Sequence, residues 1–142
     1  MTLEDFHYTL GQTIMYCQII ENDVKLIYAA MFEGDMNETL AMIINKKWTL
    51  GKTIVELKKL DFSDEEPYIS ATDCNYLKQM TEKRNHWCHE AYLQFVYDQS
   101  YLNSKEFKKE CQKLQRDNER LSSVYKALEE VRLNAMRDFN RL

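Results

Sequence analysis

Apolar residues recur at alternating steps of three and four along the first segment of the chain, residues 2–32. This spacing predicts one long helix with a single apolar face, on which Thr13 is the only polar residue. The stretch EGDMN (Glu33–Asn37) ends the pattern, and Gly34 is the expected C-cap. The positions on the apolar face are Leu3, Phe6, Leu10, Thr13, Cys17, Ile20, Val24, Ile27 and Met31.

A second long pattern begins near Ser104 and continues to the C-terminus. Its apolar residues follow a heptad, which is typical of a helix that packs along a neighbouring helix. Asn118 and Arg132 interrupt this heptad. The heptad residues are Phe107, Cys111, Leu114, Leu121, Tyr125, Leu128, Ala135, Phe139 and Leu142.

Three shorter helices are predicted between these two long ones. The first covers about residues 38–48, and the second covers Thr49–Leu60, TLGKTIVELKKL. The acidic stretch Asp61–Ser70 contains the only proline and is expected to be a loop. The third covers about residues 74–97, with Thr72 or Asp73 as its N-cap. Its apolar stripe consists of Leu77, Met80, Trp87, Ala91 and Phe95.

These patterns predict an all-α fold. The chain contains 3 glycines and 1 proline in 142 residues, whereas β-rich and α/β folds use glycine in their turns and phosphate loops. We expect a single helical domain over residues 1–142, which is long enough to bury a core. The expected architecture is a helical bundle in which the first, the fourth, motif-bearing, and the C-terminal helices are long.

The charges are distributed unevenly along the chain. Residues 1–104 hold nine Lys and Arg against sixteen Asp and Glu, whereas residues 105–142 hold ten against seven. This balance argues against a broad basic surface that coats nucleic acid, so any polyanion would be held locally. No apolar run approaches the roughly 20 residues that span a membrane, and the N-terminus lacks a signal pattern. We therefore expect a cytoplasmic protein with no membrane partner and with reduced cysteines.

The stretch TEKRNHWCHEAY, residues 81–92, holds an arginine, an asparagine, two histidines and a cysteine within six consecutive residues. Asn85 and His89 are four residues apart and share one side of a helix. Arg84 lies on the apolar line, so its stem can pack while its head reaches water or an anionic partner. Arg84 and His89 are five residues apart and diverge by about 140°. One chain would therefore make a poorly closed site, which a second copy would complete.

Three other interpretations of this stretch remain open. A metal site would use His86, Cys88, His89 and Cys74, although only His86 and His89 have the spacing that lets helical ligands converge. A nucleophile would be Cys88 with a histidine, but adjacent helical residues face different ways and nothing marks this thiol as activated. The same residues also fit a solvated helix face.

The arrangement of Arg84 and Asn85, followed by three residues and His89, resembles the Arg-x4-6-His motif of the HEPN superfamily (higher eukaryotes and prokaryotes nucleotide-binding). The segments LGQTIMYCQIIENDVKLIY and TLGKTIVELKKL and the long final helix resemble HEPN organisation over most of the chain. The HEPN toxin subgroup often has His-x-Tyr after the motif, whereas here Ala91 takes that place and Tyr92 follows one position later.

The resemblance implies a helical bundle that dimerises and brings two motifs together in a cleft. Many HEPN proteins are metal-independent ribonucleases, found in toxin–antitoxin modules, phage defence and RNA-cleaving CRISPR effectors. Arg84 and His89 would be the catalytic pair, with Asn85 beside them. RNA supplies its own 2′-hydroxyl nucleophile, so no cofactor is expected. The supporting candidates are Glu21, which would pair with Arg84 or position His89, and His86, Tyr92 and Lys83.

The expected function is therefore that of a homodimeric endoribonuclease that cleaves single-stranded RNA, with an antitoxin or another protein as a further partner. Two other functions fit the same sequence. One is a non-catalytic HEPN-like dimer that acts as a binding or regulatory module. The other is a coiled-coil adaptor whose C-terminal heptad binds a partner helix.

Overall fold

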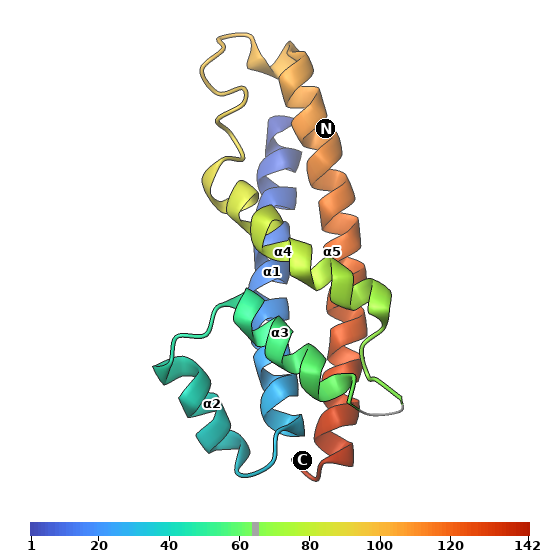
Figure 1. The fold of residues 1–142 in the computed structure, drawn as a ribbon. Coiled ribbons are helices and arrows are strands. Elements are labelled where there is room, and N and C mark those ends of the chain that lie inside the picture. Colours follow the sequence, from blue (N-terminus) through green and yellow to red (C-terminus); the bar gives the residue numbers. More distant parts are fainter. Residues whose placement is uncertain (64–65) are drawn as a thin grey trace.

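The computed structural model describes residues 1–63 and 66–142 (Figure 1). Within these residues the regular structure is entirely helical, which confirms the predicted all-α class. The helices are α1 (Leu3–Met31), α2 (Met36–Asn45), α3 (Leu50–Asp61), α4 (Ala71–His89), the short 3-10 helix η1 (Tyr101–Asn103) and α5 (Lys105–Asp138).

The two long helices α1 and α5 lie side by side and run in the same direction (Figure 1). Near their N-terminal ends the rings of Phe6 and Phe107 are 5.7 Å apart. At the other end, the Arg141 side chain donates hydrogen bonds to the carbonyl oxygens of Ala30, Phe32 and Gly34. Every predicted residue of the α1 stripe except Leu3 is buried. The two apolar stripes therefore form one continuous helix–helix contact.

The polar residues that interrupt the two stripes have partners across this contact. Asn118 of α5 donates a hydrogen bond to Thr13 Oγ1 at 3.0 Å and another to Gln12. Arg132, the second interruption of the heptad, lies 3.5 Å from the buried carboxylate of Asp23. Polar residues within a helix–helix contact specify its register, because any slip leaves them without partners.

Helices α3 and α4 cross the α1–α5 pair on one side, and α2 packs beside α1 (Figure 1). The buried apolar residues form two clusters. The larger lies among α1, α3, α4 and the second half of α5 and includes Ile20, Ile54 and Leu121. The smaller lies at the N-terminal ends of α1 and α5 and includes Phe6, Trp87 and Phe95.

Several predicted helix boundaries are wrong by a few residues. Phe32 rather than Gly34 is the C-cap of α1, because its N–H donates to the Tyr28 carbonyl, while Gly34 takes the positive φ of +109° in the following turn. Helix α2 begins two residues earlier than predicted because Asp35 caps it, and it ends at Asn45. The expected loop after α3 is present at residues 62–63 and 66–70, while residues 64 and 65 lie outside the described residues.

The C-terminal end of the predicted heptad is also wrong. Helix α5 ends at Asp138, and Asn140 adopts a left-handed φ of 57° that turns the chain. Phe139 is consequently 37% exposed and Leu142 is 79% exposed, so neither belongs to the core. Across residues 1–63 and 66–142, every helix is too short or too polar to cross a membrane.

The contact between α1 and α5 predicts which leucines of α5 support the fold. Leu121 is fully buried, and its replacement by alanine is expected to lower the free energy of unfolding by about 3 kcal/mol. Leu133 lies on the same helix but is 48% exposed, so Leu133→Ala should change it by less than about 0.5 kcal/mol. Urea denaturation followed by circular dichroism measures both values, and equal losses would contradict this packing.

Candidate functional site

The path of α4 sets the position of the motif. Ser70 caps the helix by accepting a hydrogen bond from the Asp73 N–H, so the predicted caps Thr72 and Asp73 are wrong. The helix ends at His89, eight residues before the predicted end. Ala91 and Phe95 are buried as predicted, although they lie in turns that follow the helix. The motif therefore occupies the last turns of α4 and not the middle of a long helix.

Arg84 reaches from α4 to α1. Its Nη1 donates to the Glu21 carboxylate in an ion pair, so the contact expected between these two residues is present. Its Nη2 lies 3.4 Å from Asn85 Oδ1 on the same helix. The Arg84 side chain is about one-third exposed. Glu21 thus holds the arginine head at the surface beside Asn85.

Asn85 and His89 are both exposed on the outer side of α4. Four residues separate them, so they project from one side of the helix and lie one turn apart. Within residues 1–63 and 66–142, no hydrogen bond or ion pair involves the His89 imidazole. The guanidinium of Arg84 and the amide of Asn85 therefore lie together, and the exposed imidazole of His89 lies one turn beyond Asn85. These groups can bind an anion and exchange protons with it.

Lys83 and His86, two of the supporting candidates, point toward α5 and not toward this surface. Lys83 Nζ lies 3.0 Å from Asp117 Oδ1, and the other oxygen of that carboxylate accepts a hydrogen bond from Trp87 Nε1 at 2.8 Å. His86 Nε2 lies 2.8 Å from Glu110 Oε2. These contacts fix α4 on α5, so both residues have structural partners that the sequence interpretation did not anticipate.

The α5 carboxylates Glu110 and Asp117 were missed by the sequence interpretation, although a signal for them exists. They are seven residues apart and each stands one position before a heptad position, so they flank the apolar stripe. Both are buried, and a buried carboxylate requires a charged or hydrogen-bonding partner. Lys83, His86 and Trp87 are the partners that α4 supplies.

Tyr92 has a partner that the sequence did not single out. Its hydroxyl lies 2.6 Å from Nδ1 of His7 on α1. Its ring packs edge-on against Phe6, and burial raises the pKa of its phenol. The hydroxyl is therefore neutral near pH 7 and ties the turns after α4 to the N-terminal end of α1.

The four residues of the metal interpretation do not come together. Cys74 is buried in the larger cluster near the start of α4, and His86 faces Glu110, while Cys88 and His89 are exposed. Among the described residues, no three His, Cys, Asp or Glu side chains are grouped so as to hold a metal ion.

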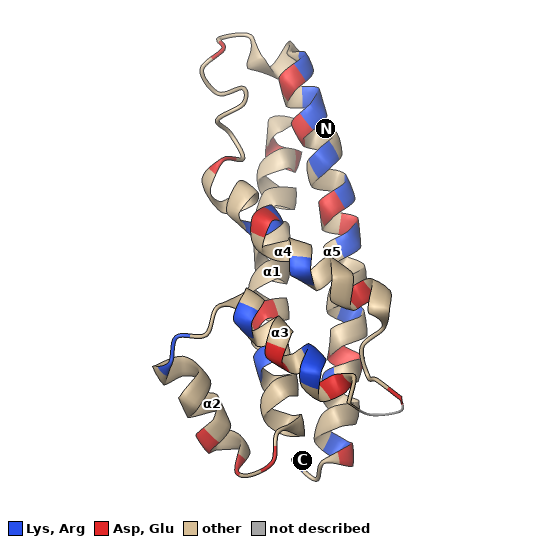
Figure 2. Cartoon of the chain, viewed as in Figure 1, with Lys and Arg blue, Asp and Glu red and all other residues tan. Residues whose placement is uncertain are grey.

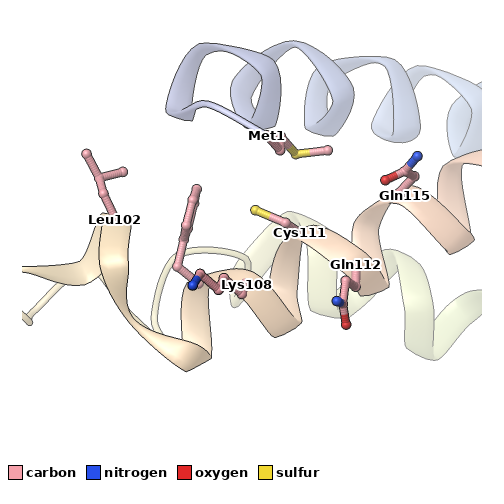
Figure 3. A pocket seen from close by; sticks show the side chains of 7 residues that line it. Met1, Leu102, Lys108, Cys111, Gln112 and Gln115 are labelled. Atoms are coloured by element: carbon pink, nitrogen blue, oxygen red, sulfur yellow. The ribbon is translucent and has the colours of Figure 1, made fainter.

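A hollow of about 290 Å³ lies between Met1, the η1 region and the start of α5 (Figure 3). Its wall is formed by Leu102, Phe107, Lys108, Cys111, Gln112 and Gln115 in addition to Met1. None of these residues belongs to the motif. The hollow holds a single charged side chain and no set of groups that indicates a reaction.

The basic side chains of residues 105–142 are spread along α5 and alternate with acidic ones (Figure 2). Lys105, Lys108, Lys109 and Arg116 are exposed on the first half of this helix, with Glu106 and Glu119 exposed among them. The excess of positive charge in this part of the chain is therefore not concentrated at the motif. An anion bound at the motif would depend on Arg84 and its immediate neighbours.

The contacts of Asp117 generate a test of how α4 is held. Asp117→Ala removes the acceptor of the buried Trp87 N–H and the partner of Lys83, so the free energy of unfolding should fall by about 2–3 kcal/mol. Asp117→Asn keeps one oxygen as an acceptor, so it should lower the free energy of unfolding by less than Asp117→Ala does. Glu119→Ala, an exposed change two residues away, is the matched control. Equal melting temperatures for Asp117→Ala and the control would show that this contact does not hold α4.

Comparisons with known protein families, curated proteins and solved structures find no match to this chain. The HEPN assignment therefore rests on the Arg84–His89 motif and on the order and length of the helices, and it stays a prediction.

Proposed function

We propose that this protein is a HEPN-type, metal-independent endoribonuclease that cleaves single-stranded RNA and acts within a toxin–antitoxin or phage-defence system. The observation that carries the proposal is the Arg84–Glu21 ion pair beside exposed Asn85 and His89. An arginine held in this way still offers N–H donors that can bind a phosphate, and His89 offers an exposed imidazole on the same helix. RNA cleavage without a metal requires charge stabilisation and proton transfer, and an arginine and a histidine can supply them.

The proposed reaction uses the 2′-hydroxyl of the RNA as the nucleophile. His89 removes the proton from this hydroxyl, and the 2′-oxygen attacks the adjacent phosphorus. Arg84 binds the non-bridging phosphate oxygens, on which negative charge increases during the attack. The bond from phosphorus to the 5′-oxygen breaks, and that oxygen receives a proton from a second acid. The products are a 2′,3′-cyclic phosphate and a 5′-hydroxyl.

The second acid is supplied by another copy of the chain in this proposal. Arg84 and His89 diverge on α4, and one chain presents a single exposed imidazole at the motif. Exposed apolar side chains follow the motif directly, with Leu93 52%, Val96 43% and Tyr97 85% exposed. Clustered apolar side chains on a surface are typical of protein–protein contacts. A two-fold dimer through this region would place two motifs next to each other.

One observation favours the non-catalytic alternative. Glu21 already neutralises Arg84, and residues 1–104 are acidic as a whole, so a bound phosphate must compete with a carboxylate. A HEPN-like dimer that binds a protein partner would not require a phosphate to displace Glu21 from Arg84. The coiled-coil adaptor has less support, because Leu114, Leu121 and Leu128 of the heptad are buried inside this chain.

The proposed roles of His89 and Arg84 predict different defects. His89→Ala should lower the cleavage rate by about 10²–10⁴-fold and leave RNA affinity nearly unchanged, because only proton transfer is lost. Arg84→Lys keeps the charge but loses the forked geometry, so it should also impair cleavage. Single-turnover cleavage of a labelled single-stranded RNA, together with a binding titration, measures both effects.

Gln79→Ala, an exposed change on α4, is the control for handling and folding, and a thermal melt of each variant accompanies the assay. Purified wild-type protein that leaves a broad panel of single-stranded RNAs intact would favour the non-catalytic module. A chain that remains monomeric by light scattering at tens of micromolar would contradict the composite site.

The use of the RNA 2′-hydroxyl predicts that cleavage continues in EDTA and that DNA is not cut. The reason is that an arginine and a histidine supply the charge stabilisation and proton transfer that a metal provides in other nucleases. Mass spectrometry of the products should detect the 2′,3′-cyclic phosphate. Activity that disappears in EDTA and returns with magnesium would overturn this mechanism.

A further inference from the structure

Two cysteines lie one helical turn from the Arg84–Glu21 ion pair, one on α1 and one on α4. Arg84 of α4 contacts Glu21 of α1, and further along the chain Tyr92 contacts His7. Where they are in contact, α4 and the turns after it therefore run in the opposite chain direction to α1. Cys17 lies one turn from Glu21 in this direction, and Cys88 lies one turn from Arg84, each about 6 Å along its helix. The register therefore predicts that the next facing pair after the ion pair consists of two thiols.

The two thiols differ in their access to solvent. Cys17 is 1% exposed within the larger core cluster, whereas Cys88 is exposed to solvent. Burial raises the pKa of the Cys17 thiol to about 12, and Cys88 is the neighbouring group that raises it most. This effect of Cys88 on the pKa of Cys17 agrees with the helix register, which predicts that the two thiols lie near each other. The pair therefore consists of one accessible thiol and one enclosed thiol behind it.

We propose that Cys17 and Cys88 are a site of reversible oxidation, at which a disulfide forms between α1 and α4 in the middle of the Arg84–His89 motif. Both cysteines are free thiols in this structure. Disulfides in reducing compartments are typically transient and redox-sensing, and a pair of one accessible and one resolving cysteine is their usual form. This inference does not rest on the proposed ribonuclease function.

A hydroperoxide is the oxidant that fits this arrangement. The Cys88 thiolate attacks the terminal peroxide oxygen, and the O–O bond breaks, so that Cys88 becomes a sulfenic acid and the peroxide leaves as an alcohol or water. The Cys17 sulfur then attacks the Cys88 sulfur. The new S–S bond forms as hydroxide leaves, and the proton lost by Cys17 converts it to water. The two electrons removed from the thiols are those that reduce the peroxide.

The enclosed position of Cys17 makes the disulfide slow to reduce. An external thiolate reaches only the exposed sulfur of Cys88, so it must expel Cys17 as the leaving group. Leaving groups of high pKa depart slowly in thiol–disulfide exchange, and burial raises the pKa of Cys17. Oxidation would thus hold the last turn of α4 against α1, between the arginine and the histidine of the motif.

Peptide mapping of the oxidised protein tests the proposal. The full chain is treated at low micromolar concentration with hydrogen peroxide, its remaining thiols are alkylated under denaturing conditions, and trypsin is added without reductant. Each of the four cysteines falls in a different tryptic peptide, and the expected product links residues 1–25 to residues 85–105. The intact chain should lose the mass of two hydrogen atoms, and its melting temperature should rise because the cross-link constrains the unfolded state.

Four variants make the result specific. Cys88→Ser changes an exposed residue and should fold normally, yet it should abolish both the mass loss and the rise in melting temperature. Cys17→Ser should abolish them as well. Cys74→Ser and Cys111→Ser, the matched controls, should retain them. Added dithiothreitol should reverse the mass loss more slowly than it reduces a small-molecule disulfide.

Two outcomes would overturn the proposal. In one, Cys88 is oxidised to sulfinic acid or joins two chains, while Cys17 is still fully alkylated after denaturation. In the other, the dominant linked peptides include Cys74 or Cys111. Neither outcome depends on an RNA assay, so the failure of this inference and the failure of the proposed function can be told apart.

Discussion

The parallel contact between α1 and α5 is the constraint on which the rest of the structure depends. Two helices that run in the same direction cannot be joined by a short turn, so residues 32–104 must return along the length of the pair (Figure 1). That return path contains α3, α4 and the turns that follow them. The register of the pair is set where Asn118 meets Thr13 and where Arg132 meets Asp23, because a slip would bury these groups without partners.

This register also decides where the motif lies. Asp117 and Glu110 of α5 bind Trp87, Lys83 and His86, which fixes one side of α4. Glu21 of α1 fixes the arginine on another side. Asn85 and His89 have no partner on α1 or α5 among the described residues, and both are exposed. The position of the arginine, the amide and the second histidine is therefore a consequence of how three helices cross, and not of α4 alone.

The sequence predicted the larger features of the fold and only part of the candidate site. The all-α class and the buried stripe of α1 follow from periodicity, because a spacing that recurs over many positions is little affected by any single residue. The pairing of Glu21 with Arg84 was one of two roles expected for Glu21, because Glu21 lies beside one apolar face and Arg84 lies on another, where charge needs a partner. The end of α4 was predicted too late, since buried Ala91 and Phe95 continue the helical spacing although their backbone forms turns.

The sequence by itself determined the set of helices, their buried faces and the presence of an Arg-x4-His motif that also contains His86 and Cys88. Only the tertiary structure decided which of those side chains are available. His86 and His89 are three residues apart and look equivalent in the sequence, yet one is bound to Glu110 and the other is exposed. The reason is physical: the partner of His86 is 24 residues away along the chain, and no local pattern specifies which carboxylate the packing of α4 on α5 will bring to it.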